Sequence, residues 1–281
     1  MFNISFLFGV TAPFDSSHRL ITSAFMPPLV LGLIRLTFAV YGVAGIFIKL
    51  IIAKDESAGA SFSYFSNITY WGITFYLLFS SFHGLTYALR GVYPLAQWPK
   101  FLQALHLLLY STIVNYPFIV TIVFWSLQYG PEKLASPYLA WSNISRHALN
   151  VLVSVLEVIL PRTEPMPWVH APLLVLMLGG YCAIVYITEA NEGFYTYGFM
   201  NPTKQGPGKV AGVIVGIGVG SVFLFAIIRL VIMIRCRLTE KDQARPLESR
   251  DGPETQAVEL VIFRSRQEKE PKDPLRCVED V

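Results

Sequence analysis

The segment from residue 139 to residue 160 carries a polar stripe on an otherwise apolar sequence. Five polar residues recur there at intervals of 4, 3, 4 and 3: Asn143, His147, Asn150, Ser154 and Glu157. These intervals place all five on one face of a helix. A histidine and a carboxylate in a helix long enough to cross a bilayer are costly unless they face polar partners, water or a substrate. The stripe is therefore the first candidate functional site, and the fold must enclose it.

The composition predicts a membrane protein. Of the 281 residues, 53% are hydrophobic and 15% are charged, and the mean hydropathy is +0.49, which is too apolar for an ordinary soluble domain. Six segments approach the roughly 20 residues that span a hydrocarbon core, and only α-helices suit such lengths. The expected spans are Pro28–Ala53, Ser66–Leu89, Phe101–Leu127, Leu139–Leu160, Trp168–Thr188 and Val210–Ile234.

The end of the chain predicts its orientation and a domain boundary. Four basic residues follow the last span closely: Arg235, Arg237, Lys241 and Arg245. The positive-inside bias therefore places the C-terminus in the cytosol, and an even number of spans places the N-terminus there too. Residues 236–281 hold nine Lys or Arg and eleven Asp or Glu, so we expect a disordered tail. The predicted fold is all-α, with a six-helix transmembrane domain at 1–235 and this cytosolic tail at 236–281.

Other polar groups within the spans have structural explanations. Arg35 lies deep in the first span, and Glu157 is the one intramembrane carboxylate with which it would pair. Arg229 lies near the cytosolic end of the last span, where it can snorkel. For His83 and His106 we expect hydrogen bonds between helices, because no further ligand at a suitable spacing supports a zinc site.

The chain offers no pattern for a bound metal or cofactor. Gly212, Gly216 and Gly220 recur every four residues, which indicates close helix packing better than phosphate binding. The net charge of +3 gives no indication of a nucleic-acid partner. We therefore expect no metal, no nucleotide or other cofactor and no nucleic acid.

Ser66 and His147 are expected at a similar depth in the membrane. Ser66 opens the second span and His147 lies in the first half of the fourth, and two helices that are two spans apart enter from the same side. A hydroxyl and an imidazole placed in this way meet the minimum requirement for a base-activated nucleophile. The same placement is also compatible with polar contacts that only hold the bundle together.

At these residues the chain resembles the androgen-induced membrane proteins, a family whose animal members hydrolyse fatty acid esters of hydroxy fatty acids. The main motif is Trp141-x-Asn143-x-x-x-His147, with Glu157 ten residues later. Three weaker motifs follow the family's order: Tyr64-Phe65-Ser66-Asn67, Tyr116-Pro117-Phe118 with Phe124-Trp125, and Gly193-Phe-Tyr-Thr-Tyr197. The resemblance covers the six-helix body and omits the tail, and the loops look more similar to the fungal branch.

The resemblance implies a membrane-embedded hydrolase of lipid esters, with a hydroxyl nucleophile and a histidine base. The family's histidine falls on His147, and its nucleophilic threonine falls on or beside Ser66. Thr69, one turn further along, is an alternative nucleophile. Gly198 stands where the family's loop has proline, so the loop that covers the substrate is expected to differ in geometry.

Further residues would support this chemistry. The amide of Asn67 or Asn143 would donate a hydrogen bond to the developing oxyanion. Glu157 lies about 15 Å from His147 along the helix axis, so a structural or substrate-gating part is expected for it. The aromatic residues of the loop from Glu189 to Lys209 would either cap an acyl pocket or form an interfacial belt.

Two other functions remain open at this stage. A membrane-bound cyclase or isomerase acting on a prenylated metabolite would use Glu157 as its acid, and Glu157 would then matter more than Ser66. A non-enzymatic membrane scaffold would keep its function without His147. In each case the expected partners are the bilayer and a membrane lipid or other hydrophobic molecule, in the endoplasmic reticulum or the plasma membrane, with the oligomeric state open.

Overall fold

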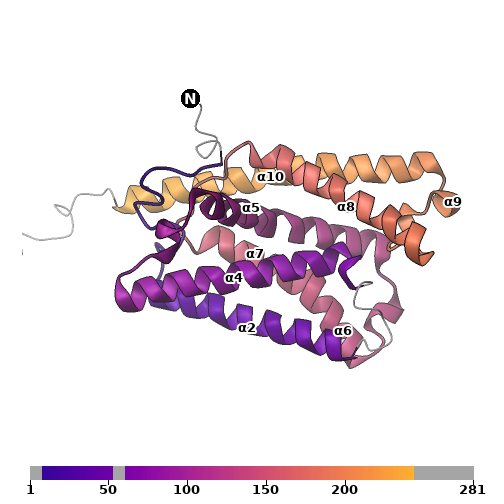
Figure 1. The fold of residues 1–281 in the computed structure, drawn as a ribbon, viewed down its shortest axis with the longest axis horizontal. Coiled ribbons are helices and arrows are strands. Elements are labelled where there is room, and N and C mark those ends of the chain that lie inside the picture. The colour runs from indigo at the N-terminus through magenta and orange to yellow at the C-terminus, as the bar shows by residue number, and fades with distance from the viewer. Residues whose placement is uncertain (1–7, 53–60, 244–281) are drawn as a thin grey trace, which may run out of the picture. The chain divides into compact units, whose positions relative to one another are not determined.

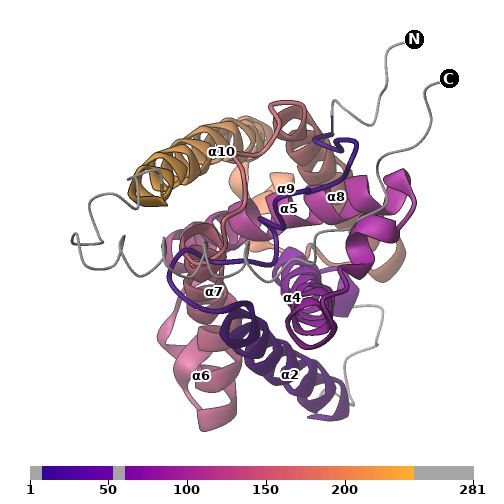
Figure 2. The ribbon, with the colours of Figure 1, turned by 90° about the vertical axis from the view of Figure 1, so that its left-hand side faces the viewer.

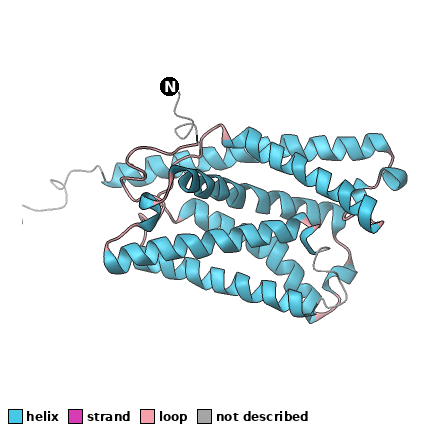
Figure 3. Cartoon of the chain, viewed as in Figure 1, coloured by secondary structure: helices cyan, strands magenta, loops and turns pink. Residues whose placement is uncertain are grey.

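The computed structural model describes residues 8–52 and 61–243, and its regular structure is helical (Figure 3). The longer helices are α2 (Pro28–Ile52), α4 (Phe65–Arg90), α5 (Lys100–Val123), α6 (Pro137–Ile144), α7 (Asn150–Ile159), α8 (His170–Glu192) and α10 (Pro207–Gln243). The shorter ones are η1 (Pro94–Gln97), η2 (Phe124–Gln128), η3 (Pro131–Leu134), η4 (Ser145–Leu149), η5 (Gly198–Met200) and α9 (Pro202–Gln205). No β-strand forms in the described ranges, where Ser23 and Pro161 make an isolated antiparallel bridge.

The expected all-α fold class is confirmed for these ranges, and each of the six expected spans overlaps one or more helices. Four helices are long and apolar enough to cross a membrane: α2, α5 together with η2, α8, and residues Pro207–Thr239 of α10. The chain is therefore a helical membrane-embedded protein. The helix α4 and the continuous helix made by α6, η4 and α7 carry more polar residues, and their crossing of the membrane stays a prediction.

The chain divides into two compact units, residues 1–236 and residues 237–281. Most of the predicted disordered tail, from residue 244 onward, lies outside the described residues. The helix α10 continues to Gln243, so the first residues of the predicted tail are helical.

The helices α2 and α4 lie side by side (Figure 1) because glycines of α2 let the two backbones approach. A Cβ atom added at Gly42 would lie 2.4 Å from the hydroxyl oxygen of Thr74. One added at Gly45 would lie 2.6 Å from the hydroxyl oxygen of Tyr70. Close approach at small residues is a main source of helix association in membranes, where no hydrophobic driving force acts between helices.

The glycine run of α10 does not form such a contact. A Cβ atom added at Gly212, Gly216 or Gly220 meets no atom within 4 Å, so the prediction of close packing there is wrong for the part of the chain that the structure describes. The neighbouring side chains of Val215 and Val219 are exposed. No other helix packs closely against α10 at these three glycines.

The helix α5 supplies the centre of the bundle, between α4, α7 and α8 (Figure 2). Its buried side chains join a core that includes Tyr110, Ile113, Val114, Tyr116 and Ile119. Asn115 and Ser221 exchange hydrogen bonds between α5 and α10. The helix α5 therefore contacts α4, α7 and α8 and is hydrogen-bonded to α10.

The segment that precedes α2 folds over one end of the bundle. Val10, Phe14, Leu20 and Ile21 are buried against the connection that follows α4. The Arg162 amide donates a 2.9 Å hydrogen bond to the Thr22 carbonyl. These contacts hold the segment to the link between α7 and α8.

Candidate functional site

Ser66 and His147 line one pocket of about 430 Å³. Its walls come from α4, α5, α8 and α10, and from the loop after α8. The apolar part of the lining includes Phe65, Ile119, Val120, Val123, Leu178, Ile214 and Val222. Pockets of this size with few polar groups suit small hydrophobic ligands or an acyl chain. The two residues that the sequence singled out as a nucleophile and its base therefore line the same pocket.

Two π-helical segments position His147. It lies in η4, where the helix takes a wider turn, and Phe124 opens the second such segment, η2. The imidazole stacks on the Phe124 ring with centroids 3.7 Å apart and planes 2° from parallel. Thr121 and the Trp125 indole donate hydrogen bonds of 2.7 and 3.1 Å to the His147 carbonyl oxygen. Segments of this kind occur often at functional sites, and no pattern in the sequence indicated them.

The His147 ring is held by packing rather than by polar partners. The residue is 6% exposed, and its Nδ1 atom has no hydrogen-bond partner among the described residues. A buried polar atom without a partner calls for an explanation, because such atoms are rare in native structures. No hydrogen bond from the described residues to Nδ1 therefore fixes the tautomer of this ring.

Two tyrosine hydroxyls surround the start of α4. The Phe65 amide donates to the hydroxyl oxygens of Tyr181 and Tyr197 at 3.1 and 3.0 Å. The Tyr181 hydroxyl in turn donates to the Ser63 carbonyl oxygen at 2.7 Å. These bonds fix the first turn of α4, and with it the backbone of Ser66.

Tyr197 lies in the loop after α8, and its hydroxyl also contacts Ser66. Burial raises the pKa of the Tyr197 phenol above its ordinary value, so it stays protonated near neutral pH and can donate a hydrogen bond. The aromatic loop had been expected to cap a pocket or form an interfacial belt, and Tyr197 and Phe199 do line the pocket. Nothing in the sequence marked Tyr181 as a residue of the site, because a tyrosine in an apolar helix is common.

The structure does not bring the other candidate residues to this pocket. The Asn67 amide donates to the Ser61 carbonyl oxygen at 2.7 Å, and the Asn143 amide donates to the Lys133 carbonyl oxygen at 2.8 Å. The Thr69 hydroxyl is buried and has no hydrogen-bond partner within residues 8–52 and 61–243, and Thr69 is not part of the pocket lining. The predicted nucleophilic part for Thr69 and the oxyanion parts for Asn67 and Asn143 therefore gain no geometric support.

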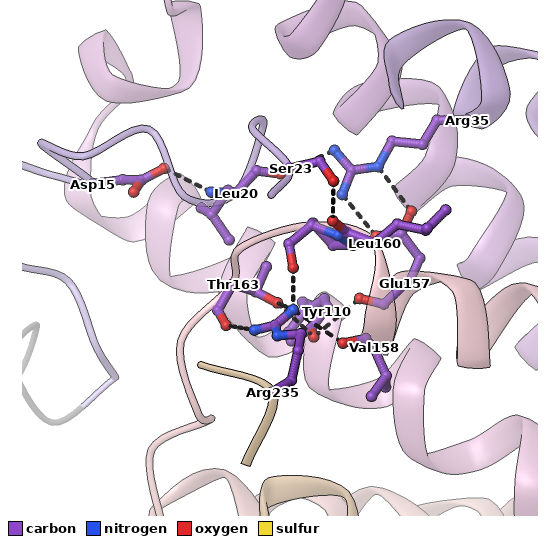
Figure 4. Close-up of polar contacts among 11 residues, drawn as sticks. Asp15, Leu20, Ser23, Arg35, Tyr110, Glu157, Val158, Leu160, Thr163 and Arg235 are labelled. Carbon is purple, nitrogen blue, oxygen red and sulfur yellow. Dashed lines mark hydrogen bonds and ion pairs between the residues drawn. The ribbon is translucent and has the colours of Figure 1, made fainter. Parts of the chain in front are cut away.

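Glu157, at the other end of the polar stripe, forms a buried ion pair with Arg35 (Figure 4). The Arg35 Nε and Nη2 atoms donate to the two carboxylate oxygens at 2.8 and 2.7 Å. Arg35 Nη1 donates to the Leu20 carbonyl oxygen at 2.9 Å. The pairing considered from sequence is confirmed, and it supports the structural part expected of Glu157.

Arg235 extends this polar region toward α10. Its guanidinium donates to the carbonyl oxygens of Val158, Pro161 and Thr163, which are left free where α7 ends (Figure 4). A cation at the C-terminal end of a helix is favourable because it meets the negative end of the helix dipole. Arg229 donates to the Met166 carbonyl oxygen and its guanidinium lies over the Trp168 ring, so it too has a structural position.

The environment of His83, in α4, differs from its prediction. His83 has no exposed surface, and neither of its ring nitrogens has a hydrogen-bond partner among the described residues. The expected hydrogen bond between helices is therefore wrong for His83 in this part of the chain. Its ring packs edge-on against Trp98 and His106, at 4.8 and 5.9 Å between centroids. Among the described residues, no group of three His, Cys, Asp or Glu is arranged to hold a metal ion.

Comparison with known proteins identifies the family. A family model described as FAR-17a/AIG1-like protein matches residues 32–232, which covers α2 through most of α10 and includes both Ser66 and His147. Comparisons with curated proteins and with solved structures give no match. The match extends over more than half of the chain, so this chain belongs to the FAR-17a/AIG1-like family.

Proposed function

We propose that the chain is a membrane-embedded hydrolase of lipid esters, of the type that cleaves fatty acid esters of hydroxy fatty acids. The main observation that supports this function is that Ser66 and His147 line one apolar pocket of about 430 Å³. A lipid ester has the matching chemistry, because an acyl chain suits the apolar walls and its carbonyl carbon is the atom that a serine attacks. Family membership supports the choice of substrate class.

In the proposed reaction, His147 accepts the hydroxyl proton of Ser66 while the Ser66 oxygen attacks the ester carbonyl carbon. The ester C–O bond then breaks, and the leaving alkoxide takes the proton from His147. Water next attacks the acyl-Ser66 ester, with His147 as base again, and releases the fatty acid. The stacked Phe124 ring holds the imidazole in one plane through both steps.

Tyr197 is the donor that we assign to the developing oxyanion. Its hydroxyl contacts Ser66, and a neutral phenol is compatible with an apolar pocket. A hydrogen bond that strengthens as charge develops on the substrate oxygen lowers the barrier directly. This assignment replaces the amides of Asn67 and Asn143, which are already engaged elsewhere.

The proposed substrate reaches the site from the bilayer. We propose six membrane spans with both termini in the cytosol, in the endoplasmic reticulum or the plasma membrane. The basic residues after Ile234 support this orientation through the positive-inside bias, and the exposed apolar side chains along α10 support lateral contact with lipid.

The alternative functions receive less support. A cyclase or isomerase would need Glu157 as a proton donor in a substrate cavity, whereas both Glu157 carboxylate oxygens accept hydrogen bonds from Arg35. A scaffold would not account for a buried imidazole without a partner beside an apolar pocket. Activity measurements on variants of His147 and Glu157 separate the three functions.

The proposal is tested by reaction of the detergent-solubilised protein with a long-chain fluorophosphonate, followed by peptide mapping of the adduct. We expect an adduct on Ser66 in the wild type, and none on that peptide in Ser66→Ala or His147→Ala. Each variant is compared at equal amounts of folded protein. Thr69→Ala is the matched control, since it removes a buried hydroxyl one turn away and should keep the Ser66 adduct.

Loss of labelling in Thr69→Ala alone would instead move the nucleophile by one turn of α4. A folded wild type that never carries an adduct on α4 would refute the proposed hydrolase mechanism.

A further inference from the structure

A second pocket, of about 490 Å³, lies toward the end of the bundle where α8 begins. It shares no lining residue with the Ser66 pocket. Its walls come from the segment before α2, from α5, and from the link between α7 and α8. The lining is more polar, and includes Asp15, Arg19, Tyr110, Thr163 and Glu164. The proposed hydrolase mechanism uses none of these residues.

Ser111 and His170 line this second pocket and form a hydroxyl–imidazole pair. The Ser111 Oγ atom lies 2.7 Å from His170 Nδ1, and both residues have no exposed surface. Ser111 also lies 3.2 Å from the Leu107 carbonyl oxygen, a common contact for a serine within a helix. The shorter contact is the one to the ring nitrogen. In the tautomer whose Nδ1 carries no proton, the serine donates to it, which is the arrangement that activates a serine as a nucleophile.

The surroundings of the pair differ from those of an ordinary buried hydrogen bond. Both residues border the pocket and neither has exposed surface, so an ester reaches the serine oxygen only when the pocket wall moves locally. Arg19 and Glu164 form a 3.3 Å ion pair in the pocket wall, with 24% and 68% of their side chains exposed. The pocket therefore has a polar wall that reaches water, and it suits a compact polar molecule better than a long acyl chain.

We propose that this pocket is a second reactive site, in which Ser111 is the nucleophile and His170 the base toward small, water-soluble esters. The Ser111 oxygen attacks the ester carbonyl carbon, and its proton passes to His170 Nδ1. The ester C–O bond breaks, and the leaving alcohol takes that proton. The product is an acyl-Ser111 ester, which water hydrolyses to a short carboxylic acid. The site acts independently of Ser66 and His147.

The test treats the detergent-solubilised full chain with two small probes, 4-nitrophenyl acetate and diisopropyl fluorophosphate, and maps the adducts by peptide mass spectrometry. The Ser66→Ala variant serves as the background, so that any adduct on α5 is independent of the first pocket. We expect an acetyl or phosphoryl group on Ser111 in this background. In addition, His170→Gln should slow its formation by about 10²-fold, the scale of general base catalysis.

Two controls keep the outcome clear. Thr112→Val removes the neighbouring hydroxyl of α5, which bonds only to the Leu109 carbonyl oxygen of its own helix, and it should leave the Ser111 adduct unchanged. His147→Ala should also leave it unchanged while it abolishes the Ser66 adduct in the unaltered chain. An absent Ser111 adduct in folded protein, or one formed equally fast in His170→Gln, would overturn the second site and leave the first untouched.

Discussion

The polar stripe has hydrogen-bonded charged groups toward one end and, within the described residues, a histidine with an unbonded ring nitrogen toward the other. At one end, Glu157 accepts two hydrogen bonds from Arg35, and Arg235 is bonded to the carbonyl oxygens at the end of α7. At the other end, His147 is buried with an Nδ1 atom that has no partner among the described residues. Both ends are shielded from water, so exposure does not explain the difference.

The difference teaches which polar groups stabilise the bundle and which are available for chemistry. Burial of a charge is costly unless it is paired and hydrogen-bonded, and the Arg35–Glu157 end meets that condition. A neutral imidazole costs less to bury, so it can be left without a partner and beside a pocket. Substitutions at the paired end should therefore change stability, and substitutions at His147 should change activity.

The largest effect is expected from Glu157→Ala. This change leaves Arg35 buried without its counter-charge, which typically costs about 3–5 kcal/mol, so we expect a large loss of folded protein and a lower unfolding temperature. The measurement is thermal unfolding in detergent, followed by fluorescence and size-exclusion chromatography. The double variant Arg35→Met with Glu157→Met removes both charges and should recover most of the loss. Equal unfolding temperatures for wild type and Glu157→Ala would show that the ion pair does not stabilise the bundle.

His147→Gln should produce the reverse outcome. The side chain has no polar partner at Nδ1 to lose, so the unfolding temperature should change little, whereas ester hydrolysis should fall by about 10²–10⁴-fold because the base is gone. The matched control is Ser154→Ala, which removes a buried hydroxyl from the same stripe and should keep the activity per folded molecule. The distinction between the two ends fails if His147→Gln unfolds the protein as readily as Glu157→Ala does.

Phe124→Leu probes how the imidazole is held. Stacked aromatic pairs contribute about 0.5–1.5 kcal/mol beyond area burial, so loss of the ring should lower hydrolysis by about tenfold at most, with His147 still present. Phe101→Leu changes an exposed phenylalanine of the same helix and provides the control. Equal rates in the two variants would mean that stacking does not orient His147.

The smallest effect is expected at Asp15. This residue lies in the segment before α2, close to the Arg35–Glu157 end of the polar stripe. Burial raises the pKa of the Asp15 carboxyl above its ordinary value of 3.8. The stabilising contribution of the protonated group is therefore complete below the unfolded-state pKa and is lost as pH rises through the folded-state pKa. Thermal unfolding from about pH 4 to about pH 7 should show wild type losing stability relative to Asp15→Asn. A difference that is constant with pH would contradict the raised pKa.

The sequence predicted the helices well and the packing between them less well. Apolar segments near bilayer length were enough to locate α2, α4, α5, α8, α10 and the helix of the polar stripe, because each signal is local. The close contact between α2 and α4 was missed, since glycines at positions 42 and 45 become informative only when the facing Tyr70 and Thr74 are known.

The candidate site was predicted only in part, because sequence patterns are local and contacts between helices are not. Ser66 and His147 could be related through topology alone, since both helices were expected to enter from one side. The π-helical turns, the stacked Phe124 and the hydroxyl of Tyr181 depend on contacts between helices, and no local pattern encodes them. The Ser111–His170 pair joins positions 59 residues apart and could not be recognised from spacing.

The most direct test of the central claim is hydrolysis of a fatty acid ester of a hydroxy fatty acid by the purified protein, measured in a single turnover. Wild type, Ser66→Ala, His147→Gln and Ser111→Ala are compared at equal amounts of folded protein. We predict release of the hydroxy fatty acid by wild type and Ser111→Ala, with an acyl group transiently on Ser66, and a loss of about 10²-fold or more in the other two variants. Absence of hydrolysis by folded wild type, or hydrolysis that survives in both Ser66→Ala and His147→Gln, would contradict the account.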